Sequence, residues 1–230
     1  MVRCTLALVL LALATPAHAE LRTTDGDTPA HRYSSLTQEA CEAALEDRGI
    51  PFKRDSAKGV MAAVRLTGAL HGVLFRTNDR NEERRETSIW EIADCRLVLA
   101  LDDFAKILAE HDIVEVRHYS LHRKAPDRWP DDKIGQQHIG GLAIDAAKFI
   151  KKDGSKLDVL DDFKGRIGAR TCGPKARKVK SAAALELREI VCAAVDARLF
   201  NVVLTPDHNR AHRNHFHLEV TPGVTWMMVR

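Results

Sequence analysis

The four cysteines that follow the first 19 residues constrain the fold of this chain most strongly. They are Cys41, Cys95, Cys172 and Cys192, and a fifth cysteine, Cys4, lies in the amino-terminal segment. An even number in an oxidising compartment predicts two disulfides, which would tie distant segments together. Four cysteines can form two disulfides in three ways, and the sequence alone does not decide among them. Because each pair of neighbours lies within one apparent half of the fold, we favour Cys41 with Cys95 and Cys172 with Cys192. Zinc binding by these thiols is the alternative, and the absence of any CxxC spacing disfavours it.

The amino terminus predicts export. Arg3 supplies a positive charge, residues 6–14 are apolar, and Ala17-His18-Ala19 ends in an A-x-A cleavage pattern. We therefore expect residues 1–19 to be a secretory signal peptide and the mature chain to be periplasmic or secreted. An uncleaved anchor is the alternative. The apolar stretch is shorter than the roughly 20 residues that span a bilayer, so we expect no membrane span.

Length and charge limit the number of domains and the kinds of partner. Residues 20–35 are polar and aperiodic, so we expect a flexible leader there and a single domain over residues 36–230. The chain contains 35 basic and 32 acidic residues, and removal of Arg3 leaves 34 against 32. Nucleic-acid-binding proteins usually carry a clustered basic excess, so this near balance argues against a nucleic-acid partner. We expect a monomer.

Hydrophobic periodicity predicts helices interleaved with strands. Apolar residues at 97, 98, 101, 104, 107 and 108 form the stripe of a packed helix over 96–110. We also expect helices at 37–49 and 181–199 and strands at 60–66, 73–75, 113–119, 142–147, 200–204 and 215–220. Residues 78–86 should form a solvated hairpin tip or loop, and residues 121–137 a long irregular loop. The order has no regular βαβ rhythm and no internal repeat. We therefore predict an α+β fold with a mainly antiparallel central sheet flanked by helices.

Four of the eleven histidines fall between residues 208 and 217. On a strand, His215 and His217 would project to one face while Phe216 and Leu218 project to the other, toward a core. Two neutral imidazoles aimed into one space suit a zinc site. An HxH pattern alone is only suggestive, because surface or hydrogen-bonded histidines are the alternative.

A second group of residues lies in the segment His138-Ile139-Gly140-Gly141-Leu142-Ala143-Ile144-Asp145. The two glycines allow a tight turn, after which Ala143 and Asp145 share one face of a strand. An aspartate in an apolar strand is costly to bury unless it is paired or bound to a cation. A solvent-facing aspartate on an edge strand is the alternative. The turn can bring His138 and Asp145 together.

The pattern HxxGxAxD followed later by HxH resembles the metallopeptidase group of lysostaphin-type enzymes, D-alanyl-D-alanine carboxypeptidases and the hedgehog signalling domain. Within that group the chain is most similar to the extensin-like carboxy-terminal domain family, through the HFH sequence at 215–217 and the Leu142-Ala143-Ile144-Asp145 strand. The resemblance covers residues 37–220, although only the two motif regions are specific. It implies a hedgehog and DD-peptidase-like version of the α+β fold.

The resemblance also implies a role for each motif residue. His138, Asp145 and His217 correspond to the three ligands of a single Zn²⁺ ion. His215 resembles the catalytic histidine beside that ion. His212 looks like the additional active-site histidine of penicillin-insensitive murein endopeptidases, which share the HxxHxH spacing; a surface histidine on the approach loop is the alternative.

The chain departs from the family pattern in two places. Gln136 stands where members often have serine, which affects a hydrogen bond behind the ligands rather than a ligand. Asn214 stands where dipeptidase-type relatives carry a glutamate, so we assign the general base to His215, with His212 as a possible helper. An upstream arginine often steadies the substrate in this group. Arg123 is the best candidate, with Arg117 behind it, and a solvated surface cation is the alternative for either.

Three protein ligands leave one zinc position open, as in catalytic zinc sites. Export and the family resemblance together predict hydrolysis of peptide cross-links or D-alanine-containing stem peptides of bacterial peptidoglycan, by a DD-carboxypeptidase or a murein endopeptidase. A zinc-bearing binding or signalling domain that has lost hydrolysis is the main rival. A disulfide-stapled structural wall protein is a third reading.

Overall fold

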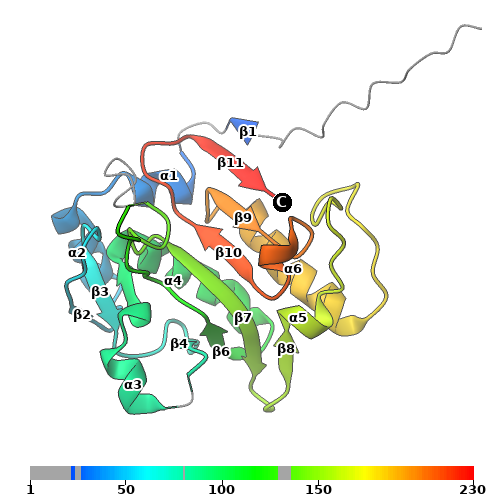
Figure 1. Ribbon diagram of the computed structural model, residues 1–230, viewed down its shortest axis with the longest axis horizontal. Coiled ribbons are helices and arrows are strands. Elements are labelled where there is room, and N and C mark those ends of the chain that lie inside the picture. The colour runs from blue at the N-terminus through cyan, green and yellow to red at the C-terminus, as the bar shows by residue number, and fades with distance from the viewer. Residues whose placement is uncertain (1–21, 24–26, 80, 129–135) are drawn as a thin grey trace, which may run out of the picture.

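The computed structural model of the chain describes residues 22–23, 27–79, 81–128 and 136–230 (Figure 1). The predicted signal peptide lies outside the described residues, as do residues 20–21 and 24–26 of the predicted leader. The predicted α+β fold with a mainly antiparallel sheet is confirmed. Among the described residues, no helix has both the length and the apolar character needed to cross a membrane.

An eight-stranded sheet forms the centre of the molecule (Figure 1). Its strands follow the order β1-β11-β9-β10-β7-β6-β4, and β8 pairs with β7 beside this path. They are β1 (Arg22–Thr23), β4 (Leu74–Thr77), β6 (Ile113–His118), β7 (Ala143–Lys151), β8 (Lys156–Asp158), β9 (Val202–Leu204), β10 (Phe216–Glu219) and β11 (Trp226–Val229). Among the strands that the structure describes, only the β4–β6 and β9–β11 pairs are parallel. The central strands β6, β7, β10 and β9 form an antiparallel platform.

Two long helices, α4 (Cys95–Glu110) and α6 (Ala182–Asp196), lie behind this sheet in the view of Figure 1. Phe104 on α4 packs edge-on against Phe200, with ring centroids 5.8 Å apart. Phe216 on β10 packs against Phe149 on β7 and against Phe163. Because the side chains of a strand alternate, the opposite faces of β7 and β10 are left for polar residues.

A smaller antiparallel sheet, β2-β3-β5, packs beside this core together with helix α2. Its elements are α2 (Gln38–Asp47), β2 (Phe52–Arg54), β3 (Ala63–Leu66) and β5 (Ile92–Asp94). The disulfide Cys41–Cys95 joins α2 to the first residue of α4. Asp94 caps α4 by accepting a hydrogen bond from the backbone N of Arg96, and its carboxylate also pairs with the Arg96 guanidinium.

The second disulfide joins Cys172, in an irregular segment, to Cys192 on α6. That segment follows the short helix α5 (Val159–Asp162). Both favoured pairings are therefore confirmed. Disulfides persist in oxidising compartments, so the two bonds are compatible with an extracellular location.

Part of the predicted leader is folded. Pro29–Ser34 forms helix α1, in which Ala30 and Tyr33 are buried. Thr28 caps the helix and Pro29 occupies its first turn, a position at which proline is favoured. The Tyr33 hydroxyl donates a hydrogen bond to Asp103 on α4. The sequence of the segment did not predict this helix, because the contacts that hold it are made to a residue 70 positions away.

Two further segments differ from their predicted form or were not anticipated. The charged segment predicted as a loop contains the exposed helix α3 (Glu82–Thr87), capped by Asn81, and a 3₁₀ turn η1 (Ile89–Glu91) follows. The prediction of a solvated segment holds, since none of the α3 residues is buried. A second 3₁₀ turn, η3 (Arg210–His212), precedes β10. In the predicted irregular loop, residues 121–128 and 136–137 contain no helix or strand, and residues 129–135 lie outside the described residues.

Candidate metal centre

Asp145 and His217 face each other across the centre of the sheet. The antiparallel register of β7 and β10 pairs these two residues directly. Their neighbours Ile144, Phe216 and Leu218 point into the core and are completely buried. The alternation of the two strands thus places both polar side chains on the other face of the sheet, where His217 Nδ1 lies 3.1 Å from Asp145 Oδ1.

A tight turn before β7 brings His138 to the same point. The Gly141 backbone N donates to the His138 carbonyl and the Leu142 N donates to the Gln137 carbonyl. Gly141 has a φ of 66°, and a Cβ there would lie 2.8 Å from the backbone N of Asp94. That same N–H donates to the Gly141 carbonyl at 2.8 Å. Only glycine fits this left-handed position against Asp94, so the second glycine of the motif, Gly141, has a steric cause.

His138, Asp145 and His217 offer ligand atoms that all lie within 4.8 Å of one another. All three residues are buried, with Asp145 only 1% exposed. His138 Nε2 lies 3.0 Å from Asp145 Oδ1, and His215 Nε2 approaches the same oxygen at 3.3 Å. Burial acts to raise the pKa of Asp145, but these imidazole partners hold that pKa far below its usual range. The carboxylate is therefore ionised in the folded protein.

The outer nitrogen of each predicted ligand histidine is held by an acceptor. His138 Nδ1 lies 3.1 Å from the Leu121 carbonyl oxygen, and His217 Nε2 lies 3.2 Å from Glu219 Oε2. Because carbonyl and carboxylate oxygens accept, each outer nitrogen is placed to donate a proton. With the proton on the outer side, the inner nitrogens, His138 Nε2 and His217 Nδ1, would be the ones available to a metal. A carboxylate or carbonyl behind each imidazole is the usual arrangement at metal sites.

The pKa values of His138 and His217 reflect burial and these same contacts. Burial lowers the pKa of His138. Burial also acts to lower the pKa of His217, but hydrogen bonds to Asp145 and Glu219 outweigh it and raise that pKa to about 9. A proton on the inner nitrogen of His217 thus occupies the place that a cation would take. The donor set of two imidazoles and one carboxylate fits zinc in residue type, burial and support.

His215 lies just before β10 and is oriented by Asn214 and Tyr119, a supporting role that the sequence did not predict for either residue. Its Nδ1 donates to Asn214 Oδ1 at 2.9 Å, and Asn214 Nδ2 donates to the Tyr119 hydroxyl at 2.9 Å. Tyr119 also packs edge-on against the His215 ring, with centroids 5.8 Å apart. These contacts leave His215 Nε2 directed at Asp145 Oδ1, 3.3 Å away. Asn214 therefore holds His215 in place.

His212 lies beside the three ligand candidates without joining them. Its ring centroid is 5.1 Å from that of His215 and 5.8 Å from that of His217. Its Nδ1 is 2.9 Å from Asn209 Oδ1, the residue that also caps η3. Burial, followed by the neighbouring imidazoles, lowers the pKa of His212 to about 4. The ring is therefore neutral at neutral pH.

Arg123 forms an ion pair with a residue of the centre, whereas Arg117 pairs with a residue outside it. Arg123 pairs with Asp145 Oδ2 and donates from Nε to Ser120 Oγ at 2.8 Å. Its side chain remains 51% exposed, so it borders the centre and solvent at once. Arg117 pairs with Glu115 at 2.9 Å on β6, and within the described part of the chain it forms no ion pair with the three clustered residues.

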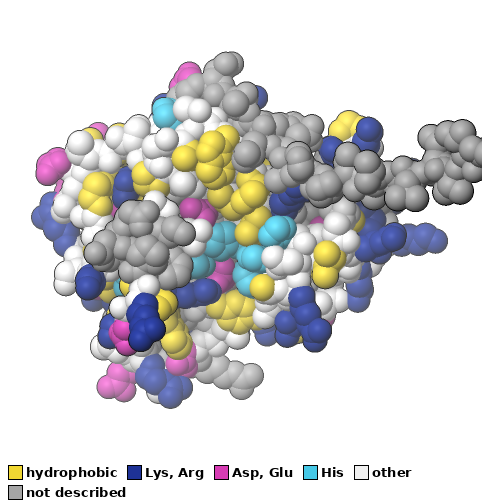
Figure 2. Space-filling model, turned by 45° about the horizontal axis from the view of Figure 1, so that its top comes forward, with side chains coloured by type: hydrophobic (Ala, Val, Ile, Leu, Met, Phe, Trp, Pro, Cys, Tyr) yellow, Lys and Arg dark blue, Asp and Glu magenta, His cyan; other side chains and the backbone are white. Residues whose placement is uncertain are grey.

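Glu219, whose Oε2 lies 3.2 Å from His217 Nε2, was also absent from the residues that the sequence predicted for the site. The strand alternation that links His215 with His217 continues to position 219, so the sequence HFHLE carried a signal for it. Figure 2 shows histidine side chains gathered near the middle of one face of the molecule, next to acidic and basic groups.

A sequence model of a protein family, described as extensin-like protein C-terminus, matches residues 39–229. The match includes every residue of the centre described above. No curated protein and no solved structure matches the chain.

Proposed function

The chain belongs to the extensin-like C-terminal family, and from that premise we propose that it is an exported zinc peptidase that hydrolyses amide bonds in bacterial peptidoglycan peptides. Within this proposal the family is related to the lysostaphin, D-alanyl-D-alanine carboxypeptidase and hedgehog group. The scissile bond belongs to a cross-link or to a D-alanine-containing stem peptide.

The observation that carries the proposal is the convergence of two imidazoles on one carboxylate oxygen with their outer nitrogens already engaged. Structural zinc sites use four protein ligands, whereas catalytic sites keep a position open. Three clustered residues, His138, Asp145 and His217, leave such a position. The chemistry that bound zinc supplies there is Lewis-acid activation of water and of an amide carbonyl.

The other residues of the chain have separate tasks in this mechanism. Arg123 holds Asp145 Oδ2 and leaves Oδ1 facing the imidazoles. Asn214 fixes the proton of His215 on Nδ1, so Nε2 accepts the proton of the attacking water. The same nitrogen then returns the proton to the leaving amine. His212, neutral and adjacent, is placed to hydrogen-bond the incoming peptide.

The test is incubation of the purified mature chain with peptidoglycan, with and without chelator, followed by mass analysis of released muropeptides. Metal-dependent new amino termini support the proposal. Intact muropeptides from a zinc-loaded protein contradict it and favour a binding or signalling domain without hydrolysis.

Two histidine variants separate the assigned roles. His215→Ala should retain stoichiometric zinc and lose about 10² to 10⁴ in rate, the usual contribution of a positioned acid or base. His217→Ala should lose the metal itself. His111→Ala, at the C-terminal end of α4, is the matched control and should alter neither. Unchanged turnover in His215→Ala would remove its assignment.

A further inference from the structure

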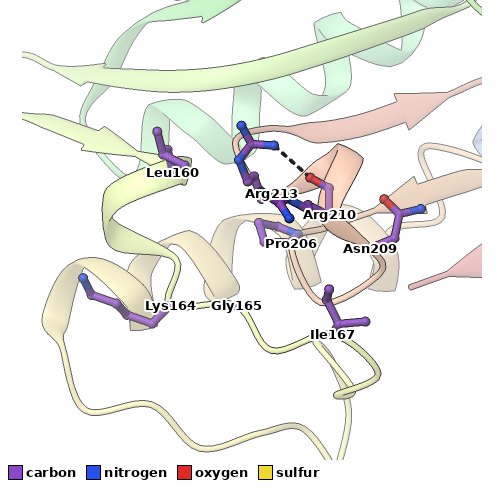
Figure 3. Close-up of a pocket in the computed structure, with 8 residues that line it drawn as sticks. All are labelled: Leu160, Lys164, Gly165, Ile167, Pro206, Asn209, Arg210 and Arg213. Carbon is purple, nitrogen blue, oxygen red and sulfur yellow. Dashed lines mark hydrogen bonds between the residues drawn. The ribbon is translucent and has the colours of Figure 1, made fainter.

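An open groove with a volume of about 410 Å³ lies between two segments of the chain (Figure 3). One wall comes from α5 and the segment after it, and the other from the segment that contains η3. Three cations line it, namely Lys164, Arg210 and Arg213, together with three apolar residues, Leu160, Ile167 and Pro206.

The positive charge of this groove is not neutralised by neighbouring carboxylates. Lys164 Nζ donates to the backbone carbonyl of Asp161, and Arg213 donates to the backbone carbonyl of Arg210. Within the described part of the chain, none of the three cations pairs with a carboxylate. Residues 164–180 add to the effect, with seven Lys and Arg and no Asp or Glu in a chain that is otherwise nearly balanced. Figure 2 shows basic side chains on the side of the face to the right of the histidines, where Figure 1 places this segment.

The two walls are held together by one buried carboxylate. Asp207 is 1% exposed and accepts from the Arg166 backbone N at 2.6 Å and from the Thr171 hydroxyl at 3.0 Å. Arg188 on α6 donates to the same carboxylate at 3.1 Å. Gly165 lies so close to Pro206 that a Cβ would come within 2.6 Å of the proline Cβ. The groove is therefore a preformed feature with fixed walls.

Asn209 connects the groove to the metal centre. It lines the groove, and its Oδ1 is also the partner of the His212 ring. The His212 ring lies 5.1 Å from that of His215, the assigned base. A chain that lies in the groove and passes Asn209 would therefore approach the His212 and His215 side of the centre.

We propose that this groove binds an acidic peptide segment of the substrate, on one side of the bond to be cut. The proposal rests on the proposed function and names the substrate class: a peptide with free carboxylates between small apolar side chains. Separated cations match carboxylates on such a chain, while Leu160 and Ile167, which are 53% and 64% exposed, offer apolar contact between them. A phosphate polymer would use the cations and leave these apolar side chains unmatched.

Binding can be measured on chelated, metal-free protein, so that cleavage is not required. The probe is a fluorescein-labelled peptide of alternating alanine and glutamate, and its glutamine counterpart is the uncharged comparison. The wild type should prefer the glutamate peptide, with an affinity that falls as salt rises. Lys164→Gln/Arg210→Gln should weaken that affinity about tenfold, as expected for two exposed charge contacts.

The matched control is Lys53→Gln/Arg84→Gln, which removes the same charges from exposed positions on β2 and α3. It should bind like the wild type. Arg213→Gln alone provides a second variant on the other side of η3 and should weaken binding in the same direction. Equal loss in the control pair, equal binding of both peptides, or stronger binding of inorganic polyphosphate than of the glutamate peptide would overturn the proposal.

Failure of this proposal and failure of the proposed function give different results. If the groove binds the acidic peptide but zinc-loaded protein releases no muropeptides, the hydrolase is wrong and the groove stands. If muropeptides are released with the same KM by the wild type and by Lys164→Gln/Arg210→Gln, the groove is wrong and the hydrolase stands.

Discussion

His217 on β10 lies directly opposite Asp145 on β7, and His217 Nδ1 is 3.1 Å from Asp145 Oδ1. The backbone pairing of two central strands therefore fixes the separation of two proposed ligands. Sites built on strands hold their geometry better than sites built on loops. Only His138 depends on a turn, and that turn is anchored by a backbone bond between Gly141 and Asp94.

Asp145→Asn should abolish zinc binding while keeping the size of the side chain. The wild type should contain one zinc per chain by elemental analysis. Zinc at 100 times its Kd should stabilise the fold by about 2.7 kcal/mol, visible as a higher melting temperature. Asp47→Asn, at an exposed position near the end of α2, is the control and should retain both effects. Equal zinc content in Asp145→Asn and the wild type would remove Asp145 from the ligand set.

Gly141→Ala should damage fold and centre together. The left-handed φ of 66° and the 2.8 Å approach to Asp94 N act together, so we expect a loss of about 2 to 4 kcal/mol in unfolding free energy and weaker zinc binding. Gly49→Ala separates the two causes, because Gly49 has a φ of 65° and no atom within 4 Å of its Cβ position. Urea unfolding should show a loss of about 1 kcal/mol there, with zinc binding unchanged. Similar losses in the two variants would mean that the contact with Asp94 is unimportant.

Acid should release helix α1 through Asp103. Burial acts to raise the pKa of Asp103, but Lys106 and the Tyr33 hydroxyl outweigh it, so the pKa in the folded chain is lowered. A lowered pKa gives stability that is present above the unfolded value of about 3.9 and is lost as the pH falls through the folded value. Asp103→Asn should cost about 1 to 2 kcal/mol at pH 7.

Thermal melting of the wild type and of Asp103→Asn between pH 2 and pH 7 checks this prediction. The two curves should differ at neutral pH and converge in acid. A constant difference across that range would show that the charge of Asp103 does not hold α1 on α4.

The two disulfides should differ in their effect on zinc. Cys41–Cys95 closes a separation of 54 residues and Cys172–Cys192 one of 20, so chain entropy predicts losses of about 4 and 3 kcal/mol when each is replaced by serines. Cys95 follows Asp94, which holds the His138 turn through Gly141. Loss of Cys41–Cys95 should therefore weaken zinc binding more than loss of Cys172–Cys192, measured by competition with a chromogenic chelator. A larger loss of zinc affinity on removal of Cys172–Cys192 would contradict the proposed coupling between Cys41–Cys95 and the His138 turn.

Side-chain alternation, helical periodicity and glycine spacing predicted the elements that depend on residues close together in the sequence. The alternation of His215 through Leu218 predicted β10 and its buried face, and the apolar stripe of 96–110 predicted α4 almost to the residue. The glycine pair predicted a turn that brings His138 toward Asp145, and these residues are in contact. The metal that they would hold remains a prediction.

Contacts between distant segments were beyond the reach of those patterns. Helix α1 is short and polar in sequence, and it is held by Tyr33 against Asp103 and Arg48. The support of His215 by Asn214 and Tyr119 joins residues 95 positions apart. The sequence showed that Asn214 stands where dipeptidase-type enzymes carry a glutamate. It did not show that Asn214 contacts His215 and Tyr119.

The backbone hydrogen bond between Asp94 and Gly141 connects the segment that the Cys41–Cys95 disulfide holds to the turn that carries His138, a proposed metal ligand. Before Cys41 and Cys95 are joined, α2 and the start of α4 are free to separate, and the His138 turn loses its firm backing. We therefore expect the reduced chain to bind zinc weakly and to bind it tightly only after the Cys41–Cys95 disulfide has formed. Under the proposed function, this order would withhold hydrolysis until the chain has reached an oxidising compartment.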